Sequence, residues 1–392
     1  MVKYKLYGNG IDDDYPAIQE MLDSRMSLVE LPVPKKNYLI SKTLKIHGGQ
    51  TIKLSPYSVI KLKPDSNCAM LEDDDFCSWK ENICVDGGIW DMDNQNQEPN
   101  PWHFPGKDGK TSRQRMAECG IEYKNYKGLV PFYTGKCMRF CRIKNFVMKN
   151  VTFENPVTYC VQVSWMEYFT FRDIVCNCTK GAPKLWNMDG IHVEGNCKHG
   201  YINNIKGICQ DDMVAMTADD GAEYGPIDDV VVDGIFAENT HSAVRLLSHG
   251  EPVRNIKLSN IYGTYNSYCI GITKYHGGPE ERGCLENIII DNVAASCAVE
   301  TADVKHIPSR PFIWVQDGLD LYNLQIKNVF RSENVYTSPT IGVEETVKIN
   351  CLTIDNVHLI NNLNEPIENV IIKGEVENLT LSNVYVDKKK IK

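Results

Sequence analysis

The feature that most constrains this chain is a short apolar alternation around Asn or Asp that recurs nine times after residue 147. The nine polar positions are Asn150, Asp173, Asn204, Asp233, Asn260, Asn292, Asn328, Asn356 and Asn383. The intervals between them are 23, 31, 29, 27, 32, 36, 28 and 27 residues. Strand patterns at this spacing, with no helical period between them, are typical of a parallel β-helix in which each unit is one coil.

The polar position of the repeat has an expected structural role. Successive coils stack at about 4.8 Å, the spacing of hydrogen-bonded strands. The recurring asparagines are therefore expected to stack as a ladder at a corner, where they satisfy backbone groups. The Leu-x-x-Leu-x-Leu signature of leucine-rich solenoids is missing, which argues against that repeat class.

Two segments depart from the repeat. Residues 12–24 open with an aspartate run, followed by Pro16 and by apolar residues on one face, which predicts a helix that caps one end of the solenoid. Residues 91–135 are polar and broken by prolines, which predicts a long loop excursion that walls a cleft. Its Trp102, His103 and Phe104 are candidates to line a sugar site or to pack locally.

Composition excludes several classes of partner. The net charge is −9 and no basic stripe occurs, which argues against nucleic acid or an anionic membrane as the main partner. No run of 18 apolar residues is present, so no transmembrane helix is expected. The first residues lack an apolar signal core, so we expect a cytoplasmic protein or one whose secretion signal has been trimmed.

The fifteen cysteines are odd in number and scattered, and no Cys-x-x-Cys pair occurs. This gives poor support for a zinc site, which needs four converging ligands. Several cysteines stand where a small apolar residue fits a strand. We therefore expect buried thiols in a reducing cytoplasm.

Three carboxylates occur in two short clusters. Asp189 lies in Asn-Met-Asp-Gly, and Asp211 and Asp212 follow 22 and 23 residues later. This spacing is about one coil, so stacked clusters would make an acidic site for acid/base work on a glycosidic bond or for a hard cation. The first cluster is equally compatible with a polar turn. The adjacent pair lies in an apolar run, where paired carboxylates are costly unless they are used.

These segments resemble glycoside hydrolase family 28, the polygalacturonase family, in the pectate-lyase-like (pectin lyase fold) superfamily of right-handed β-helices. Residues 13–19 resemble the family's N-terminal helix, and residues 87–91 resemble its glycine-rich early coil. Residues 187–190 match its Asn-Thr-Asp-Gly motif, and residues 210–212 match its Asp-Asp motif at the expected separation. The resemblance covers most of the chain.

The resemblance implies roles for the acids. Asp211 would protonate the leaving oxygen, and Asp189 with Asp212 would hold and activate water, with inversion of configuration. Close carboxylates cannot all ionise cheaply, which favours one of them as the acid. Neighbours in an ideal strand point in opposite directions, so Asp211 and Asp212 need a bend or bulge to reach one site. Asn187 and Gln210 lie in the same motifs and are candidate substrate-binding residues.

The sequence departs from the family at its cationic motifs. Gly-His-Gly is absent, and Arg-Ile-Lys appears as Arg245-Leu-Leu. In polygalacturonases these two cations grip the substrate's carboxylate, so the loss of the lysine puts polygalacturonate in doubt. His241 precedes Arg245 by four residues and would share its face of a strand. Lys274, about one coil further on, could supply another cation or lie in a solvated turn.

Two further residues stay open between a site role and a packing role. His192 follows the Asn-Met-Asp-Gly motif and either lines the site or belongs to the core. Trp186 either stacks on a sugar face or packs locally.

We therefore predict a single right-handed parallel β-helix domain over residues 1–392. Its expected function is hydrolysis of a glycosidic bond in a small or uronate-containing oligosaccharide, with no cofactor and no metal. The oligomeric state is left open. The alternatives are a polysaccharide lyase or epimerase on the same fold, or a non-catalytic carbohydrate-binding β-helix, since fold does not imply function.

Overall fold

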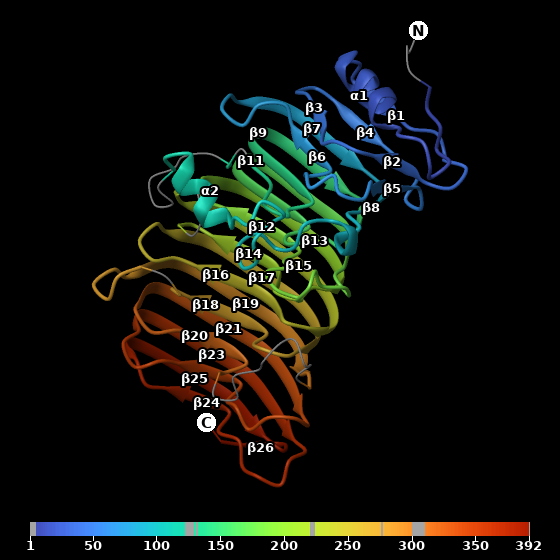
Figure 1. Ribbon diagram of the computed structural model, residues 1–392. Helices are drawn as coiled ribbons and strands as arrows, with labels where there is room; N and C mark the ends of the chain where they lie inside the picture. The colour runs from blue at the N-terminus through green and yellow to red at the C-terminus, as the bar shows by residue number, and fades with distance from the viewer. Residues whose placement is uncertain are drawn as a thin grey trace. The chain divides into compact units, whose positions relative to one another are not determined.

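The computed structural model describes residues 5–121, 129–130, 132–219, 224–275, 277–299 and 310–391 (Figure 1). The chain forms two compact units, residues 1–193 with 221–223, and residues 194–220 with 224–392. Each unit is described by itself. None of the helices in the described residues is long and apolar enough to span a membrane.

The first unit begins with the helix α1, Tyr15–Asp23, which has a proline in its first turn. Ala17, Ile18 and Leu22 are buried on one face of this helix. The buried carboxylate of Asp14, just before the helix, accepts backbone N–H groups from Gly8 at 3.1 Å and from Leu39 at 3.2 Å. This aspartate therefore joins the start of the helix to the first coil.

The strands of the first unit pair in three parallel ladders, one for each side of the coils. The first ladder is β1–β4–β7–β9–β11, the second is β2–β5–β8–β10–β11, and the third is β3–β6–β9–β11–β12. The long strands β9 and β11 bend at a corner and so take part in more than one ladder. The strand bounds are Leu28–Glu30 (β1), Tyr38–Ile40 (β2), Leu44–Ile46 (β3), Thr51–Lys53 (β4), Val59–Leu62 (β5), Leu71–Asp73 (β6), Lys80–Asp86 (β7), Ile89–Asp91 (β8), Met138–Lys149 (β9), Thr152–Glu154 (β10), Val161–Asn177 (β11) and Ile191–Glu194 (β12).

The excursion predicted for residues 91–135 contains the 3₁₀ helix η1, Asn94–Asn96, and the helix α2, Ser112–Glu118. A capping box between Thr111 and Gln114 begins α2. Residues 122–128 and 131 lie outside the described residues. The predicted cleft-walling role of this excursion stays a prediction.

The second unit alternates long strands with short ones. The long strands pair in parallel in the order β13–β15–β17–β19–β21–β23–β25, and the short strands pair in the order β14–β16–β18–β20–β22–β24. The short β26, Lys389–Lys390, pairs with β25 in the antiparallel direction. The long strands are Cys197–Ile208 (β13), Ile227–Thr240 (β15), Val253–Tyr265 (β17), Gly283–Cys297 (β19), Leu319–Glu333 (β21), Lys348–Asn361 (β23) and Glu375–Val386 (β25). The short strands are Asp212–Thr217 (β14), Ser242–Leu247 (β16), Ile270–Thr273 (β18), Ile313–Val315 (β20), Ile341–Val343 (β22) and Val370–Ile372 (β24).

The polar position of the repeat lies at a corner of the coils. Eight of the nine predicted residues have a left-handed backbone, and the ninth, Asp233, is followed by the left-handed Gly234. Asn and Asp tolerate this conformation better than other non-glycine residues. The side-chain amide of Asn292 donates to that of Asn260 at 2.7 Å, and Asn356 donates to Asn328 at 2.7 Å. The predicted asparagine ladder therefore turns the chain and links neighbouring coils.

Apolar residues of the strands fill the interior of both units. The predicted fold class is confirmed: an all-β, right-handed parallel β-helix with a short N-terminal capping helix. The prediction that residues 1–392 form one domain stays a prediction. All fifteen cysteines are free thiols, and nine of them are buried.

Candidate active site

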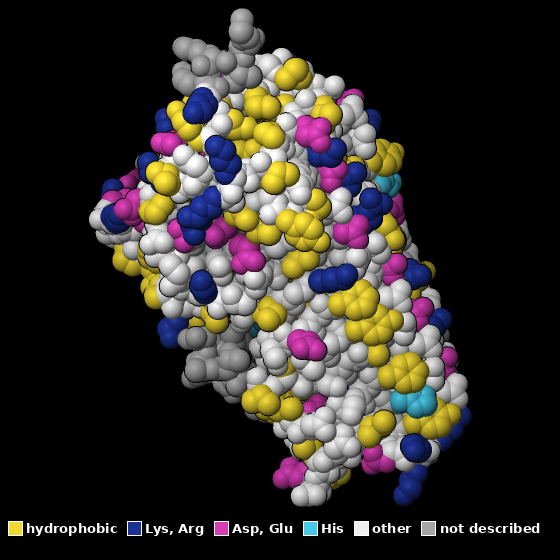
Figure 2. Space-filling view, turned by 90° about the vertical axis from the view of Figure 1, so that its right-hand side faces the viewer, with side chains coloured by type: hydrophobic (Ala, Val, Ile, Leu, Met, Phe, Trp, Pro, Cys, Tyr) yellow, Lys and Arg dark blue, Asp and Glu magenta, His cyan; other side chains and the backbone are white. Residues whose placement is uncertain are grey.

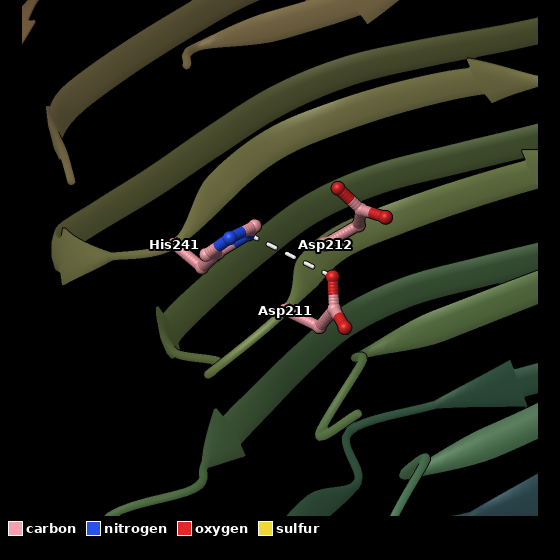
Figure 3. Close-up of side chains that lie close together, drawn as sticks. All are labelled: Asp211, Asp212 and His241. Carbon is pink, nitrogen blue, oxygen red and sulfur yellow. Dashed lines mark ion pairs between the residues drawn. The ribbon is translucent and has the colours of Figure 1, made fainter. Parts of the chain in front are cut away.

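The candidate site of the second unit is built where β14 and β16 begin. These parallel strands pair Asp212 with Ser242 and Ala215 with Arg245. Asp211 and His241 each stand one residue before their strand, so this register makes them neighbours as well. The chain bends at Gln210 and Asp211 before β14 begins. Figure 3 shows Asp211, Asp212 and His241 gathered at this edge.

Asp212 is fully buried and is held from three directions. The Nε atom of Arg245 lies 2.6 Å from its Oδ2, an ion pair whose angle falls short of a good hydrogen bond. The hydroxyl of Ser242 donates to its Oδ1, and the hydroxyl of Tyr268 donates to the same oxygen at 3.3 Å. The carboxylate is therefore fixed and charge-compensated within the unit.

Asp211 lies in a different environment. Its side chain is 26% exposed, and its Oδ1 lies 3.7 Å from Nδ1 of His241, which is an ion-pair distance but too long for a hydrogen bond. The imidazole of His241 also meets the ring of Tyr268 edge-on at 6.0 Å. Adjacent residues thus present one solvent-accessible and one sealed carboxylate.

One ligand atom from each of Asp211, Asp212 and His241 lies within 4.8 Å of the others, so the three residues could hold a metal ion. Two carboxylates and an imidazole suit several divalent metals. The guanidinium of Arg245 already compensates one of the carboxylates, which lowers the attraction of this cluster for a cation.

Aromatic residues that the sequence analysis missed surround this network. Tyr268 is buried, and burial, followed by the nearby Asp212 and Tyr275, raises its pKa well above the ordinary value. The phenol therefore stays protonated and remains a donor. Tyr268 packs against Trp314 at 5.7 Å, and Tyr275 packs against the same indole at 5.8 Å. A side chain at Gly271 would lie 2.7 Å from the Tyr268 ring, so this ring position requires glycine there.

Two arginines lie over these rings. The guanidiniums of Arg245 and Arg310 are each 5.8 Å from the ring centre of Tyr275, and that of Arg310 is 4.7 Å from the ring of Trp314. Such cation–π contacts place two permanent positive charges beside an aromatic ring that is 36% exposed.

Asp189 lies in the first unit, where it is buried beside His192. The ring nitrogen Nδ1 of His192 lies 2.5 Å from Oδ2 of Asp189, and the imidazole stacks on the ring of Tyr159 at 4.2 Å. His192 is itself buried, and its contacts orient a carboxylate.

Asn187 and Trp186 contact the excursion of the first unit. The side-chain oxygen of Asn187 lies 3.1 Å from Nδ2 of Asn100, which donates to it, and 2.7 Å from Nε2 of His103. Trp186 stacks on Phe104 at 5.7 Å and meets His103 edge-on. Its indole is still 40% exposed, so packing does not cover it.

The remaining candidates lie in the second unit. Gln210 is half-buried just before Asp211. The ammonium of Lys274 donates to the carbonyl oxygen of Gly278 at 2.8 Å, and its backbone N–H donates to the side chain of Gln316. Lys274 therefore stabilises its own turn.

Ser242 and Tyr268 could have been found from sequence only with the coil register in hand. They lie 30 and 56 residues after Asp212. The signal for Ser242 was its position one coil after the second aspartate.

The comparisons with known proteins bear on the fold. No protein-family model and no curated protein matches the sequence. The structure is similar to the family 28 exopolygalacturonase of Yersinia enterocolitica, with a TM-score of 0.62 and 14% identity over 99% of this chain and 78% of that one. A hyperthermoactive exopolygalacturonase from Thermotoga maritima gives a TM-score of 0.52 and 15% identity over 98% of this chain and 90% of that one.

A third similar solved structure is that of a bacteriophage protein. The tailspike protein of E. coli bacteriophage HK620, as a mutant in complex with a pentasaccharide, gives a TM-score of 0.62 and 12% identity. The match covers 95% of this chain and 63% of the tailspike chain. At these identities the likeness shows the shared β-helix fold, and function has to be argued from the site.

Proposed function

We propose that this protein is a glycoside hydrolase that cleaves a small or uronate-containing oligosaccharide by acid/base catalysis with aspartates. One observation carries the proposal. Asp211 reaches solvent beside His241, while the adjacent Asp212 is sealed and paired with Arg245. Two neighbouring carboxylates in unlike environments are what a division of labour between acid and base requires.

In this mechanism Asp211 donates a proton to the leaving glycosidic oxygen, and His241 beside it returns a proton between turnovers. Asp212 supplies a fixed negative charge at the same edge. A direct base role for Asp212 requires its Oδ1 to exchange one of two hydroxyl partners, Ser242 or Tyr268, for water. The motif resemblance assigns the other base-side carboxylate to Asp189. We propose inversion of configuration on the same ground.

The experiment is a reducing-end assay on a panel of uronate-containing and neutral oligosaccharides, followed by Asp211→Asn on the best substrate. The loss of an acid–base group should lower kcat by about 10²–10⁴-fold. The melting temperature should hardly change, because Asp211 is partly exposed. Asp320→Asn is the matched control, since it removes an aspartate that forms a surface ion pair with Arg282. Full activity of Asp211→Asn would remove this residue from the mechanism.

A lyase or epimerase is the second candidate, because the cluster of Asp211, Asp212 and His241 has the ligands for a divalent cation. That chemistry predicts activity that is lost with a chelator, and for a lyase an unsaturated product that absorbs ultraviolet light. The hydrolase predicts neither. If no substrate on the panel is cleaved by either route, a non-catalytic carbohydrate-binding role is the remaining proposal.

We also propose that the protein works in the reducing cytoplasm, because its fifteen cysteines are free thiols and nine are buried. A thiol reagent should detect few groups in the native protein, chiefly the exposed Cys77 and Cys119. In denaturant without reductant it should detect all fifteen. A much lower count in denaturant would indicate disulfides and an oxidising compartment.

A further inference from the structure

A row of aromatic side chains follows the long strands of the second unit and shares no residue with the candidate active site. One residue from each of six successive strands, β15 to β25, takes the same register position. We call these residues the ring row; in order they are Phe236, Tyr262, Ala294, Phe330, His358 and Tyr385. Figure 2 shows yellow side chains and one cyan histidine following one another at the lower right of the face it presents.

The rings of this row stack on one another. Phe236 and Tyr262 lie 5.2 Å apart with planes 15° from parallel. Phe330 and His358 lie 5.1 Å apart, and His358 and Tyr385 lie 4.5 Å apart, again nearly parallel. Phe236 and Phe330 remain 45% and 43% exposed, so the row is a surface feature and not part of the core.

The stack is interrupted at one position. Ala294 takes the place of a ring between Tyr262 and Phe330. Two coil steps of about 4.8 Å separate these rings by roughly 9.6 Å. A ring placed midway would stand about 4.8 Å from each neighbour, which agrees with the 4.5–5.2 Å of the existing stacks. The gap therefore has the width of one six-membered ring.

The side chains that flank Ala294 on the same face of its own strand are polar and uncharged. Asn292 and Ser296 lie two residues before and after Ala294 on the same strand, and both are partly exposed. The amide of Asn292 donates to the hydroxyl of Tyr262 at 3.1 Å, which fixes that ring beside the gap. On the preceding strand, the position that matches Ser296 is Thr264. On the following strand, Ser332 stands two residues after Phe330, the partner of Ala294. Amide and hydroxyl groups, without a charge, complement a neutral ligand that carries hydroxyls.

We infer that the gap over Ala294 is a binding site for one pyranose ring of a neutral oligosaccharide. The C–H faces of the sugar would pack between Tyr262 and Phe330, and its hydroxyls would bond to Asn292 and Ser296. A bare aromatic ring fits the width equally well but leaves these polar groups without a partner from the ligand, at a cost in free energy. This second site does not rest on the proposed hydrolase activity, because the two sites share no residue.

The test measures binding of three neutral β-linked hexasaccharides, of glucose, xylose and mannose, by titration calorimetry, with trigalacturonate and indole as comparison probes. At least one neutral hexasaccharide should bind. Ala294→Phe completes the stack and fills the gap, so it should weaken that binding by at least about tenfold while the melting temperature stays the same or rises. Phe330→Ala should also weaken binding. Tyr385→Ala is the matched control, since it removes a ring of the row that does not border the gap.

Two further variants separate the explanations. Ser296→Ala removes one hydroxyl without changing the rings and should weaken binding several-fold. Asp211→Asn should bind the sugar like the wild type even if it is inactive, which separates this site from the proposed hydrolase site. The inference is overturned if no neutral hexasaccharide binds, if only indole or trigalacturonate binds, if Ala294→Phe and Phe330→Ala bind like the wild type, or if Asp211→Asn abolishes binding.

Discussion

Each unit contains a buried carboxylate beside a cation, and the pKa values of these two carboxylates shift in opposite directions. In the first unit, Asp73 on β6 lies 2.8 Å from the ammonium of Lys80, and burial raises the pKa of Asp73 to about 7 in spite of that cation. In the second unit, Glu333 on β21 pairs with Arg331. Burial also pushes the pKa of Glu333 upward, but Arg331 and backbone N–H groups outweigh burial and lower it.

The two pKa shifts differ in direction because the two carboxylates accept different numbers of hydrogen bonds. Apart from Lys80, Asp73 accepts the backbone N–H of Cys141 at 2.9 Å, and the charge of the adjacent Glu72 works against its ionisation. The Oε2 atom of Glu333 accepts hydrogen bonds from both Nε and Nη2 of Arg331. Its Oε1 accepts three successive backbone N–H groups, those of Asn334, Val335 and Tyr336. At Asp73 one cation and one backbone N–H do not compensate burial, whereas at Glu333 the paired arginine and three backbone N–H groups do.

In the candidate active site, the contacts of Asp212 resemble those of Glu333. Asp212 is as buried as Glu333 and also has an arginine, with two hydroxyl donors in place of the backbone groups. Asp211, whose side chain is 26% exposed, is the carboxylate that reaches solvent. Asp212 and Glu333 are therefore both sealed with an arginine and further donors, and Asp211, which is left in contact with solvent, is the residue we assign as the acid.

The largest expected effect comes from removing the arginine of the sealed pair. Arg331→Met leaves the Glu333 charge buried without its cation, which should lower the free energy of unfolding by about 3–5 kcal/mol. Urea-induced unfolding followed by circular dichroism measures this. Arg282→Met is the control, since its partner Asp320 is about half exposed, and it should cost at most about 1 kcal/mol. Equal effects of the two variants would contradict the comparison.

A smaller effect is expected at Arg245. Arg245→Lys keeps the positive charge but loses the Nε contact with the buried Asp212, so we expect about 1.5–3 kcal/mol of lost stability. If Asp212 acts in catalysis, kcat/KM should fall as well, because the carboxylate is no longer held in place. The double variant Asp212→Asn, Arg245→Met should have most of the stability of the wild type, since neither buried charge remains. Melting temperature and kcat/KM measured on the same protein separate a positioning arginine from a purely structural one.

Sequence patterns determine the repeated parts of this molecule. The polar residue of the repeat could be placed at a corner of the coil from sequence. Asn and Asp recur at intervals of about one coil, and they tolerate the left-handed backbone that the corner needs. The capping helix was also predictable, with a proline in its first turn and an apolar face; it spans Tyr15–Asp23 within the predicted 12–24. Both features depend on local chemistry, which a single sequence displays.

Contacts between coils are harder to predict, because the connections vary in length and the register is not fixed by a local signal. Tyr268 lies 56 residues from Asp212, and nothing near it in the sequence indicates the contact. The inward direction of the Arg331 and Glu333 side chains could be predicted from the sequence. They alternate with the exposed Phe330 after Asn328, so their side chains point inward. The pattern gives the direction of these charges, but their pairing with each other and with backbone groups required coordinates.

The last prediction uses pH to compare the two units. Burial raises the pKa of Asp73 in the folded protein from its ordinary value of 3.8 to about 7. Between these values the folded protein holds a proton that the unfolded chain has lost. The contribution of Asp73 to stability is therefore fully present below pH 3.8 and is lost as the pH rises through 7, by at most about 1.4 kcal/mol per pH unit. The lowered pKa of Glu333 has the opposite consequence, because its contribution to stability is present above the ordinary pKa of 4.5 and is lost as the pH falls.

Urea unfolding of the wild type, Asp73→Asn and Glu333→Gln between pH 4 and pH 8 tests this. Each variant is uncharged at its position throughout, so the difference from the wild type isolates one carboxyl group. Relative to Asp73→Asn, the wild type should lose stability as the pH rises from about 4 to 7. Relative to Glu333→Gln, it should lose stability only toward the acid end. If both stability differences changed with pH in the same direction, the contacts around Asp73 and Glu333 would not set the directions of their pKa shifts, and the comparison would be wrong.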